Sequence, residues 1–466
     1  MKIQFLGATE YVTGSCYLLT VGKYRLLLDC GLLQGGFDDQ EKNQQAFAFD
    51  PVSIDAVVLS HAHLDHSGRL PLLVKQGFKG PVYSHHATVD LCKVMLEDAG
   101  YLNERSVQWD NKKRERKGLP LLDPLYTRDE ARQSLTNFKG LAYAQPGEIF
   151  PGITVTLYDA GHILGSAIVQ LDLIENGEQR TLVFSGDLGH SGAPILHDPT
   201  PVHHAHLVLM ESTYGNRLHR GWNETWQELG EIFKSARNDK GNILIPAFTV
   251  GRTQEILYML GQHFDEWQLG DWQVFLDSPM AIEANRIYSQ HSNLYDHKAQ
   301  QRFKESGTPF DLPNLHLTES TEASMNINLI SAGAIIIAGS GMCTGGRIKH
   351  HLKHNLWRRH SHVIFVGFQA RGTPGRALVD GAKQLTLWGE AINVNATVHT
   401  IGGLSAHADQ NGLCNWYQQF NNRPLLKLVH GEPDAQKILI ERLKTDFNAP
   451  VSAAKQGETL DLLTLL

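Results

Sequence analysis

The stretch that decides the fold is His61-Ala62-His63-Leu64-Asp65-His66, directly after the apolar, strand-like run Ala56-Val57-Val58-Leu59-Ser60. Four side chains of metal-ligand type lie within this six-residue stretch. Alternate side chains of an extended segment point the same way, so a strand that ends here aims His61 and His63 together. Asp65 and His66 then curl back, and we expect them to face a second ion. The spacing predicts two metal ions.

Length and composition predict a multidomain globular protein. The chain has 466 residues, about three times a typical domain, with 42% hydrophobic and 20% charged residues. Its five cysteines are odd in number and scattered, which favours a reducing cytoplasm over a disulfide framework. The N-terminus lacks the apolar stretch of a signal peptide, and no segment approaches the ~20 apolar residues of a membrane span. We therefore expect a cytoplasmic location and no membrane partner.

The charge balance limits how the chain can meet a polyanion. The net charge is 42 − 49 = −7, which argues against capture of nucleic acid by the whole surface. Any such contact must be local. Two basic runs exist, residues 112–117 and 347–360. We interpret the first as a solvated helix face, and the second is left open between that interpretation and a binding surface.

Apolar periodicity predicts an α/β fold with mixed strand directions. The first expected strands cover residues 2–6, 15–19 and 24–29, followed by helical segments at 70–77, 87–99 and 101–117. Further strands are expected at 153–158, 167–173 and 181–185. From about Val208, two doubly wound units are expected: strand 242–246 with a helix from Arg252, and strand 334–338 before a glycine-rich loop and a basic helix.

Two further ligand candidates follow strands in turns that contain glycine. These are His162 and Asp187. A dinuclear site needs an anionic group between its ions, and Asp187 is the natural bridging carboxylate. Nitrogen and oxygen ligands without thiolate suit Zn²⁺, with Mn²⁺ or Fe as alternatives. Most of the 24 histidines are expected to be ordinary core or surface residues.

The order Asp29, His61 to His66, His162, Asp187 resembles the metallo-β-lactamase fold. The resemblance implies a four-layer αβ/βα sandwich. It places His61, His63 and His162 on one ion, and Asp65, His66 and a further histidine on the other. Asp29 would orient the histidine loop.

The missing histidine is expected far downstream. His430 follows the apolar strand 426–429, and His407 lies in a loop upstream of it. Together with Met210-Glu211-Ser212-Thr213, these segments resemble the β-CASP group of nucleases. The resemblance implies an α/β β-CASP domain, residues 208–393, inserted into a metallo-β-lactamase domain formed by residues 1–207 and 394–466.

The same resemblance implies residue roles and a substrate. His430 would complete the second metal site, and histidine at that position accompanies RNA rather than DNA. A hydroxide activated by two metal ions would hydrolyse RNA, with Asp65 as the base or water-orienting group. His407 would protonate the leaving oxygen and Glu211 would hold its imidazole. The products would carry a 5′-phosphate and a 3′-hydroxyl.

Two glycine-rich segments are candidate phosphate-binding loops. They are Ser340-Gly341-Met342-x-x-Gly345-Gly346-Arg347 and the segment that ends at Arg376. Free backbone N–H groups before a helix can bind a phosphate, with Arg347 or Arg376 as charged partners. A tight turn that merely needs glycine is the rival interpretation.

Other functions use the same ligands. A glyoxalase-type thioesterase needs no inserted segment, and a non-catalytic scaffold needs no complete ligand set. A DNA nuclease of the same fold is a further alternative. The sequence leaves open endonuclease against 5′-to-3′ exonuclease action, RNA processing against decay, and a monomer against a homodimer.

Overall fold

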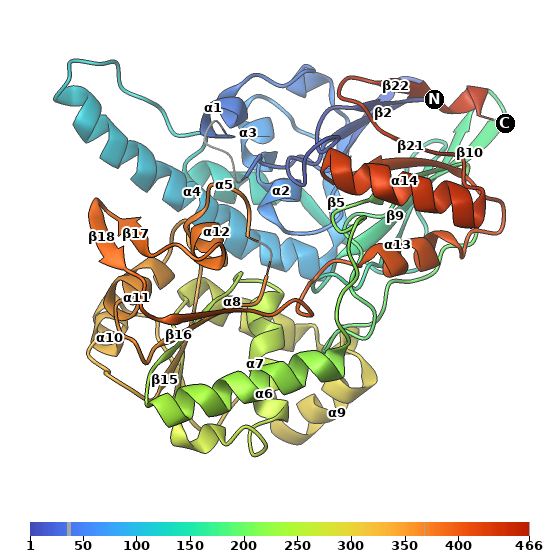
Figure 1. Cartoon of the computed structure of the whole chain (residues 1–466). Helices are drawn as coiled ribbons and strands as arrows, with labels where there is room; N and C mark the ends of the chain where they lie inside the picture. Colours follow the sequence, from blue (N-terminus) through green and yellow to red (C-terminus); the bar gives the residue numbers. More distant parts are fainter. Residues whose placement is uncertain (35–38, 368, 466) are drawn as a thin grey trace.

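The computed structural model describes residues 1–34, 39–367 and 369–465. Two seven-stranded mixed sheets form the first part of the fold (Figure 1). The first sheet has the order β22 (Thr459–Asp461), β1 (Lys2–Phe5), β2 (Tyr17–Val21), β3 (Tyr24–Leu28), β4 (Ala56–Val58), β5 (Val82–His85) and β6 (Phe138–Leu141). The second has the order β21 (Val451–Ala453), β20 (Leu425–Val429), β11 (Leu207–Glu211), β10 (Glu178–Phe184), β9 (Ala167–Glu175), β8 (Ile153–Asp159) and β7 (Gly147–Phe150).

Both faces of each sheet are buried, because alternate side chains of one strand enter different cores. Leu26 and Leu28 of β3 belong to the same core as Leu171 of β9, between the sheets, whereas Leu27 belongs to the core that includes Leu91 of α4. The predicted four-layer αβ/βα sandwich is confirmed. Its helices are α1 (Asp39–Gln44), α2 (Leu64–Ser67), α3 (Leu70–Lys75), α4 (His86–Glu115) and α5 (Arg128–Ser134) on one side, with α13 (Gln410–Tyr417) and α14 (Pro433–Phe447) on the other.

The inserted domain is built on a third sheet in which every strand pair is parallel. Its order is β14 (Leu315–Leu317), β13 (Gln273–Leu276), β15 (Ala334–Ala338), β12 (Ile243–Pro246), β16 (His362–Phe365) and β19 (Thr397–Thr400). The hairpin β17 (Gln384–Leu387) and β18 (Glu390–Asn393) is separate. The helices of this domain are α6 (Trp222–Asp239), α7 (Arg252–Gln262), α8 (Pro279–Gln290), α9 (His297–Ser306), α10 (Thr321–Ile327), α11 (Ile348–Asn355) and α12 (Pro374–Val379).

The chain changes sheet near the predicted boundaries at 207/208 and 393/394. Strand β11 pairs in parallel with β10 and β20, so residues up to Glu211 belong to the sandwich. Strand β19 pairs with β16, so residues up to Thr400 belong to the inserted sheet. Strand β11 is only tens of residues from β10 but about two hundred residues from β20 in the sequence. Local composition does not show which strands pair.

Helix α4 also differs from the prediction. The segments expected at 87–99 and 101–117 form one helix, His86–Glu115, that continues through Gly100. A Cβ at Gly100 would lie 2.8 Å from the Thr127 carbonyl oxygen and 2.9 Å from the Arg128 backbone. Glycine is therefore required by the close approach of the chain before α5, and it does not end the helix. Among the described residues, no helix is both long and apolar enough to cross a membrane.

Candidate metal centre

The candidate ligands converge because their strands end at the same edge of the two sheets. Strands β8, β10, β11 and β20 run in the same direction, and His162, Asp187, Glu211 and His430 lie at or just beyond their carboxyl ends. The facing sheet supplies Asp29 after β3 and the histidine loop after β4. This edge is where side chains can leave a parallel sheet without disturbing its core.

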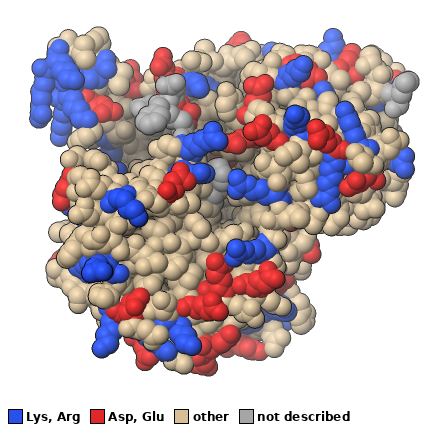
Figure 2. Space-filling view, in the orientation of Figure 1, with Lys and Arg blue, Asp and Glu red and all other residues tan. Residues whose placement is uncertain are grey.

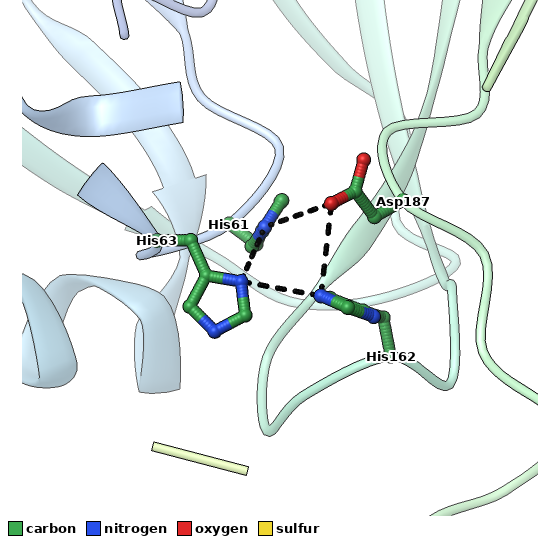
Figure 3. A group of neighbouring side chains, drawn as sticks. All are labelled: His61, His63, His162 and Asp187. Atoms are coloured by element: carbon green, nitrogen blue, oxygen red, sulfur yellow. Dashed lines mark hydrogen bonds and ion pairs between the residues drawn. The ribbon is translucent and has the colours of Figure 1, made fainter. Parts of the chain in front are cut away.

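The first ligand group contains three histidines and one carboxylate (Figure 3). His63 Nδ1 lies 3.1 Å from His61 Nε2 and 3.2 Å from His162 Nε2. Asp187 Oδ2 lies 3.5 Å from His61 Nε2 and 3.7 Å from His162 Nε2. A tetrahedral Zn²⁺ with bonds of ~2.05 Å to nitrogen would hold its ligand atoms about 3.3 Å apart. The observed separations match that geometry.

The second group shares the same carboxylate. His66 Nε2 lies 3.1 Å from His430 Nε2, and Asp65 Oδ2 lies 3.4 Å from His430 Nε2. Asp187 Oδ2 lies 3.4 Å from His66 Nε2, about as far as from His61 in the first group. Asp187 Oδ1 is buried and has no hydrogen-bond partner among the described residues. A buried carboxylate oxygen without a hydrogen-bond donor is suited to contact a cation, so the residues of this site are suited to bind metal.

Hydrogen bonds to the Nδ1 atoms of three histidines, on the side away from the centre, fix which ring nitrogen faces it. Asp29 Oδ2 accepts from His66 Nδ1 at 2.7 Å, as the predicted orienting role requires. His162 Nδ1 donates to the Ala406 carbonyl at 3.0 Å. Thr213 Oγ1 lies 3.1 Å from His430 Nδ1 and donates to the His430 carbonyl. In each case the other ring nitrogen, Nε2, faces the centre and is the atom that a metal would bind once it is deprotonated.

The electrostatics of the buried centre suit a cation. Burial holds the pKa values of His61 and His162 well below the usual range, and nearby histidines lower them further. These rings are therefore neutral, the form that binds metal. Burial opposes ionisation of Asp65, but His66 and His430 outweigh it and lower its pKa to about 2. His430, His66 and His61 likewise hold the pKa of Asp187 well below normal despite burial.

His407 lies beside the centre with a carboxylate of its own. Its Nδ1 donates to Glu211 Oε1 at 3.1 Å, and Asp187 Oδ2 lies 3.9 Å from the same nitrogen. Glu211 is fully buried and also accepts from the Leu188 and Thr213 backbone N–H groups. Burial lowers the pKa of His407, but Glu211 and Asp187 outweigh it and raise the value to about 9. The side chain of His407 is 21% exposed.

Three domain families match successive parts of this chain. The Metallo-beta-lactamase superfamily domain matches residues 18–203, the Beta-Casp domain matches residues 253–378, and the Zn-dependent metallo-hydrolase RNA specificity domain matches residues 391–454. The Thermus thermophilus protein named Ribonuclease TTHA0252 is 38% identical over 459 residues, which cover 98% of this chain and 99% of the relative. The chain belongs to the β-CASP family of metallo-β-lactamase-fold RNA nucleases.

Other members of the β-CASP family are longer. Proteins named Transcription termination factor FttA from Pyrococcus abyssi and Methanocaldococcus jannaschii are each 31% identical, over 99% and 93% of this chain and 71% and 67% of their own lengths. A crystal structure of a protein of unknown function from Enterococcus faecalis has the same fold, with a TM-score of 0.54 and 15% identity. The match covers 98% of this β-CASP chain and 99% of the Enterococcus faecalis chain.

In this β-CASP protein, hydrogen bonds within the loop and to neighbouring segments hold the glycine-rich loop before α11 in place. Ser340 Oγ accepts from the backbone N–H groups of Thr344 and Gly345 at 3.1 and 3.4 Å. Arg347 donates to Asp277 Oδ1, to the Thr318 carbonyl and to the Glu319 carbonyl, at 2.7–2.8 Å. The guanidinium predicted to pair with a phosphate therefore joins α11 to the end of β13 in this structure.

The glycines of this segment divide between packing and open space. A Cβ at Gly341 would lie 2.8 Å from the Phe248 ring, and one at Gly346 would lie 2.1 Å from the Gly339 carbonyl oxygen. A Cβ at Gly345 would meet nothing within 4 Å. Arg376 is half-exposed and pairs with Asp380 at 2.9 Å. The described contacts do not link these residues to the metal ligands.

Sequence reasoning missed the groups that hold the ligands from behind. Thr213 lies in the segment that carries Glu211, so its position was a usable signal. The carbonyl of Ala406 carries no signal in its side chain. His219 was also missed: its Nε2 donates to the His407 carbonyl at 3.1 Å, and its backbone N–H donates to Asp409. His219 lies 188 residues from His407 in the chain, so only the fold shows this contact.

Proposed function

We propose that this protein hydrolyses phosphodiester bonds of RNA at a centre of two divalent ions, with Zn²⁺ as the first candidate and Mn²⁺ or Fe as alternatives. One observation carries the proposal of two ions. A single oxygen, Asp187 Oδ2, lies 3.5 Å from a nitrogen of one ligand group and 3.4 Å from a nitrogen of the other. A carboxylate shared in this way offsets the repulsion between two cations.

Each ion has its own set of residues in this proposal. His61, His63 and His162 would hold the first, Asp65, His66 and His430 the second, and Asp187 would contact both. When bound, such ions supply Lewis acidity, which stabilises charge on a phosphate and lowers the pKa of a water molecule.

The remaining steps belong to the chain's own residues. Asp65 is ionised at neutral pH and has a side chain that is 17% exposed, so it can orient the attacking water from the open side of the site. His407 donates a proton to the leaving 3′-oxygen, because it is protonated at neutral pH and partly exposed next to Asp187. Glu211 keeps the Nδ1 proton on its own side and leaves Nε2–H to act as the acid. The products would carry a 5′-phosphate and a 3′-hydroxyl.

RNA is favoured as the substrate by the sequence comparisons and by the inserted domain. Residues 391–454 match an RNA specificity domain, and the relative of equal length is named a ribonuclease. In this proposal the inserted domain forms a second wall for the metal centre, which a thioesterase of the same fold does not need. Two glycine-rich segments are proposed to contact the RNA there, through Ser340, Gly341, Gly345, Gly346, Arg347 and Arg376. Arg347 also holds the first of these loops in place through Asp277.

The setting of the reaction is also part of the proposal. All five cysteines are free, which fits a reducing cytoplasm. Every residue of the metal groups and of the His407–Glu211 pair comes from one chain, so the chemistry requires no second copy. A homodimer stays a prediction, as do the domain limits 1–207, 208–393 and 394–466.

The test uses the purified chain loaded with Zn²⁺ or Mn²⁺. RNA labelled internally or at its 5′-end, matched DNA and a thioester are incubated in parallel, while bound metal is counted by mass spectrometry. We expect two ions per chain and cleavage of RNA alone, with the first product sizes separating endonuclease from exonuclease action. Asp187→Ala should abolish cleavage, whereas His297→Ala on the exposed start of α9 should not. Intact RNA beside a hydrolysed thioester would overturn the proposal.

A further inference from the structure

Helix α4 extends beyond the body of the protein. Its first half is anchored by buried residues such as Leu91 and Leu96, and its last buried residue is Val107. Beyond that point the helix projects outward and ends in a loop, at the upper left of Figure 1. A projecting helix end contributes little to the core, so the residues on it must be explained in another way.

The projecting end carries a concentrated positive charge. We call Trp109 together with residues 112–117, Lys-Lys-Arg-Glu-Arg-Lys, the basic tip. Residues 112–117 contain five cations and one anion, a charge of +4, so the rest of the chain carries −7 − 4 = −11. The tip is the dense blue cluster at the upper left of Figure 2. A polyanion approaching this acidic protein would be attracted locally to the tip.

Few of these cations are neutralised by the protein. Lys113 lies 3.7 Å from Asp110, an exposed pair of small energy. Within the part of the chain that the structure describes, Lys112, Arg116 and Lys117 have no carboxylate within 4.0 Å. Cations at a helix C-terminus do interact well with the helix dipole. That effect does not account for the aromatic residue beside them.

Trp109 is 61% exposed, and Lys113 Nζ lies 3.2 Å from its ring centroid, one helical turn away. An exposed indole next to lysine side chains is the chemistry that binds single-stranded nucleic acid: the ring stacks on a base while the lysines contact phosphates. The first basic run was interpreted from sequence as a solvated helix face. The exposed indole changes that interpretation.

Other residues hold the loop that follows the tip. Asn111 exchanges two hydrogen bonds with Leu122, at 2.8 and 2.9 Å, and Arg114 donates to the Pro120 carbonyl at 2.5 Å. Trp109, Lys112 and Lys113 make no described hydrogen bond to that loop. They can therefore be replaced without disturbing the return of the chain.

We propose that the basic tip of α4 is a second RNA contact outside the metal cleft, which holds the unpaired strand of a substrate long enough to reach it. This inference rests on the proposed ribonuclease function. The strand would stack a base on Trp109 and place phosphates against Lys112 and Lys113. Long substrates would be bound more tightly than short ones, without any change in the chemical step.

The experiment compares Trp109→Ala and the double variant Lys112→Gln/Lys113→Gln with a control, Lys437→Gln/Lys444→Gln on the exposed face of α14. The control removes the same charge from a helix on the opposite side of Figure 1. Alanine and glutamine are good helix formers, so the melting temperature should not fall. Each protein is assayed on a long unstructured RNA and on an RNA of about five nucleotides, which one groove can hold.

For the long RNA, Trp109→Ala should raise KM at least about fivefold, the lower end of the effect of losing one base-stacking side chain. The lysine variant should reduce the magnitude of the slope of log K against log salt concentration by about 1.4. Each phosphate contact to a single strand contributes about 0.7 to this slope. The kcat on long RNA and the kinetics on the short RNA should not change in either tip variant. The control should match the parent on both substrates.

Tip variants that match the control on long RNA would overturn the inference while leaving the ribonuclease intact. Binding of the tip to anionic vesicles, with RNA affinity unchanged, would overturn it equally. A parent enzyme that cleaves no RNA of either length would instead refute the proposed function, so the two failures are distinguishable.

Discussion

The proton donor proposed for the leaving group can be tested apart from the metal centre. His407 belongs to neither of the two histidine groups and instead forms a third cluster with Asp187 and Glu211, to which it donates a hydrogen bond. We expect His407→Ala to keep both metals and to lower kcat by about 10²- to 10⁴-fold, the usual contribution of a positioned general acid. Glu211→Gln keeps an acceptor for the Nδ1 proton but removes its charge, so a smaller loss is expected.

The decisive assay changes the leaving atom. In an RNA with a single 3′-bridging phosphorothiolate, sulfur leaves without needing a proton, so His407→Ala should cleave it almost as fast as the parent does. Single-turnover rates on the oxygen and sulfur substrates, with metal content measured on the same samples, give the comparison. An equal loss on both substrates would refute the role of His407 as the acid, and so would loss of a metal ion from the variant.

Three further outcomes follow from the structure. His430→Ala removes a ligand of the second group only, so metal content should fall from two ions to one along with activity; retention of two would refute the assignment. His219→Ala should lower kcat about 2- to 13-fold, the worth of one hydrogen bond to the His407 backbone, whereas His219→Gln should restore the rate. Burial raises the pKa of Asp159 to about 7, although the Gly161 N–H opposes this. The folded protein therefore binds an extra proton between about pH 4 and 7, and stability falls as the pH rises through that window. Asp159→Asn should gain up to about 4 kcal/mol over the parent at pH 8 and little at pH 4, by urea unfolding; a gain independent of pH would contradict this.

The candidate ligands could be found from sequence because each follows an apolar strand. The histidine loop after β4 and His430 after β20 are recognisable as strand ends, and parallel strands bring such ends to one edge. Residue type and local pattern were sufficient there. What those patterns could not give was the distance of 3.1 Å between His66 and His430, which are 364 residues apart.

Two positions depend on partners remote in the chain. Gly100 lies inside α4, where glycine is required because Thr127 and Arg128 pass close to its backbone. Arg347 is predicted to pair with a phosphate because it follows a glycine loop, and its guanidinium also pairs with Asp277, 70 residues away. Propensity and motif describe a residue's neighbours in sequence, and in both cases the neighbour in space decided.

The distance along the chain between His66 and His430 also sets the order in which the second ligand group can form. A ribosome making the protein releases the histidine loop early, whereas β20 and His430 emerge only after the entire inserted domain. Until β20 docks beside β11, the second ligand group lacks one of its three members. In the proposed two-ion mechanism, the second ion would therefore bind only after synthesis has passed β20.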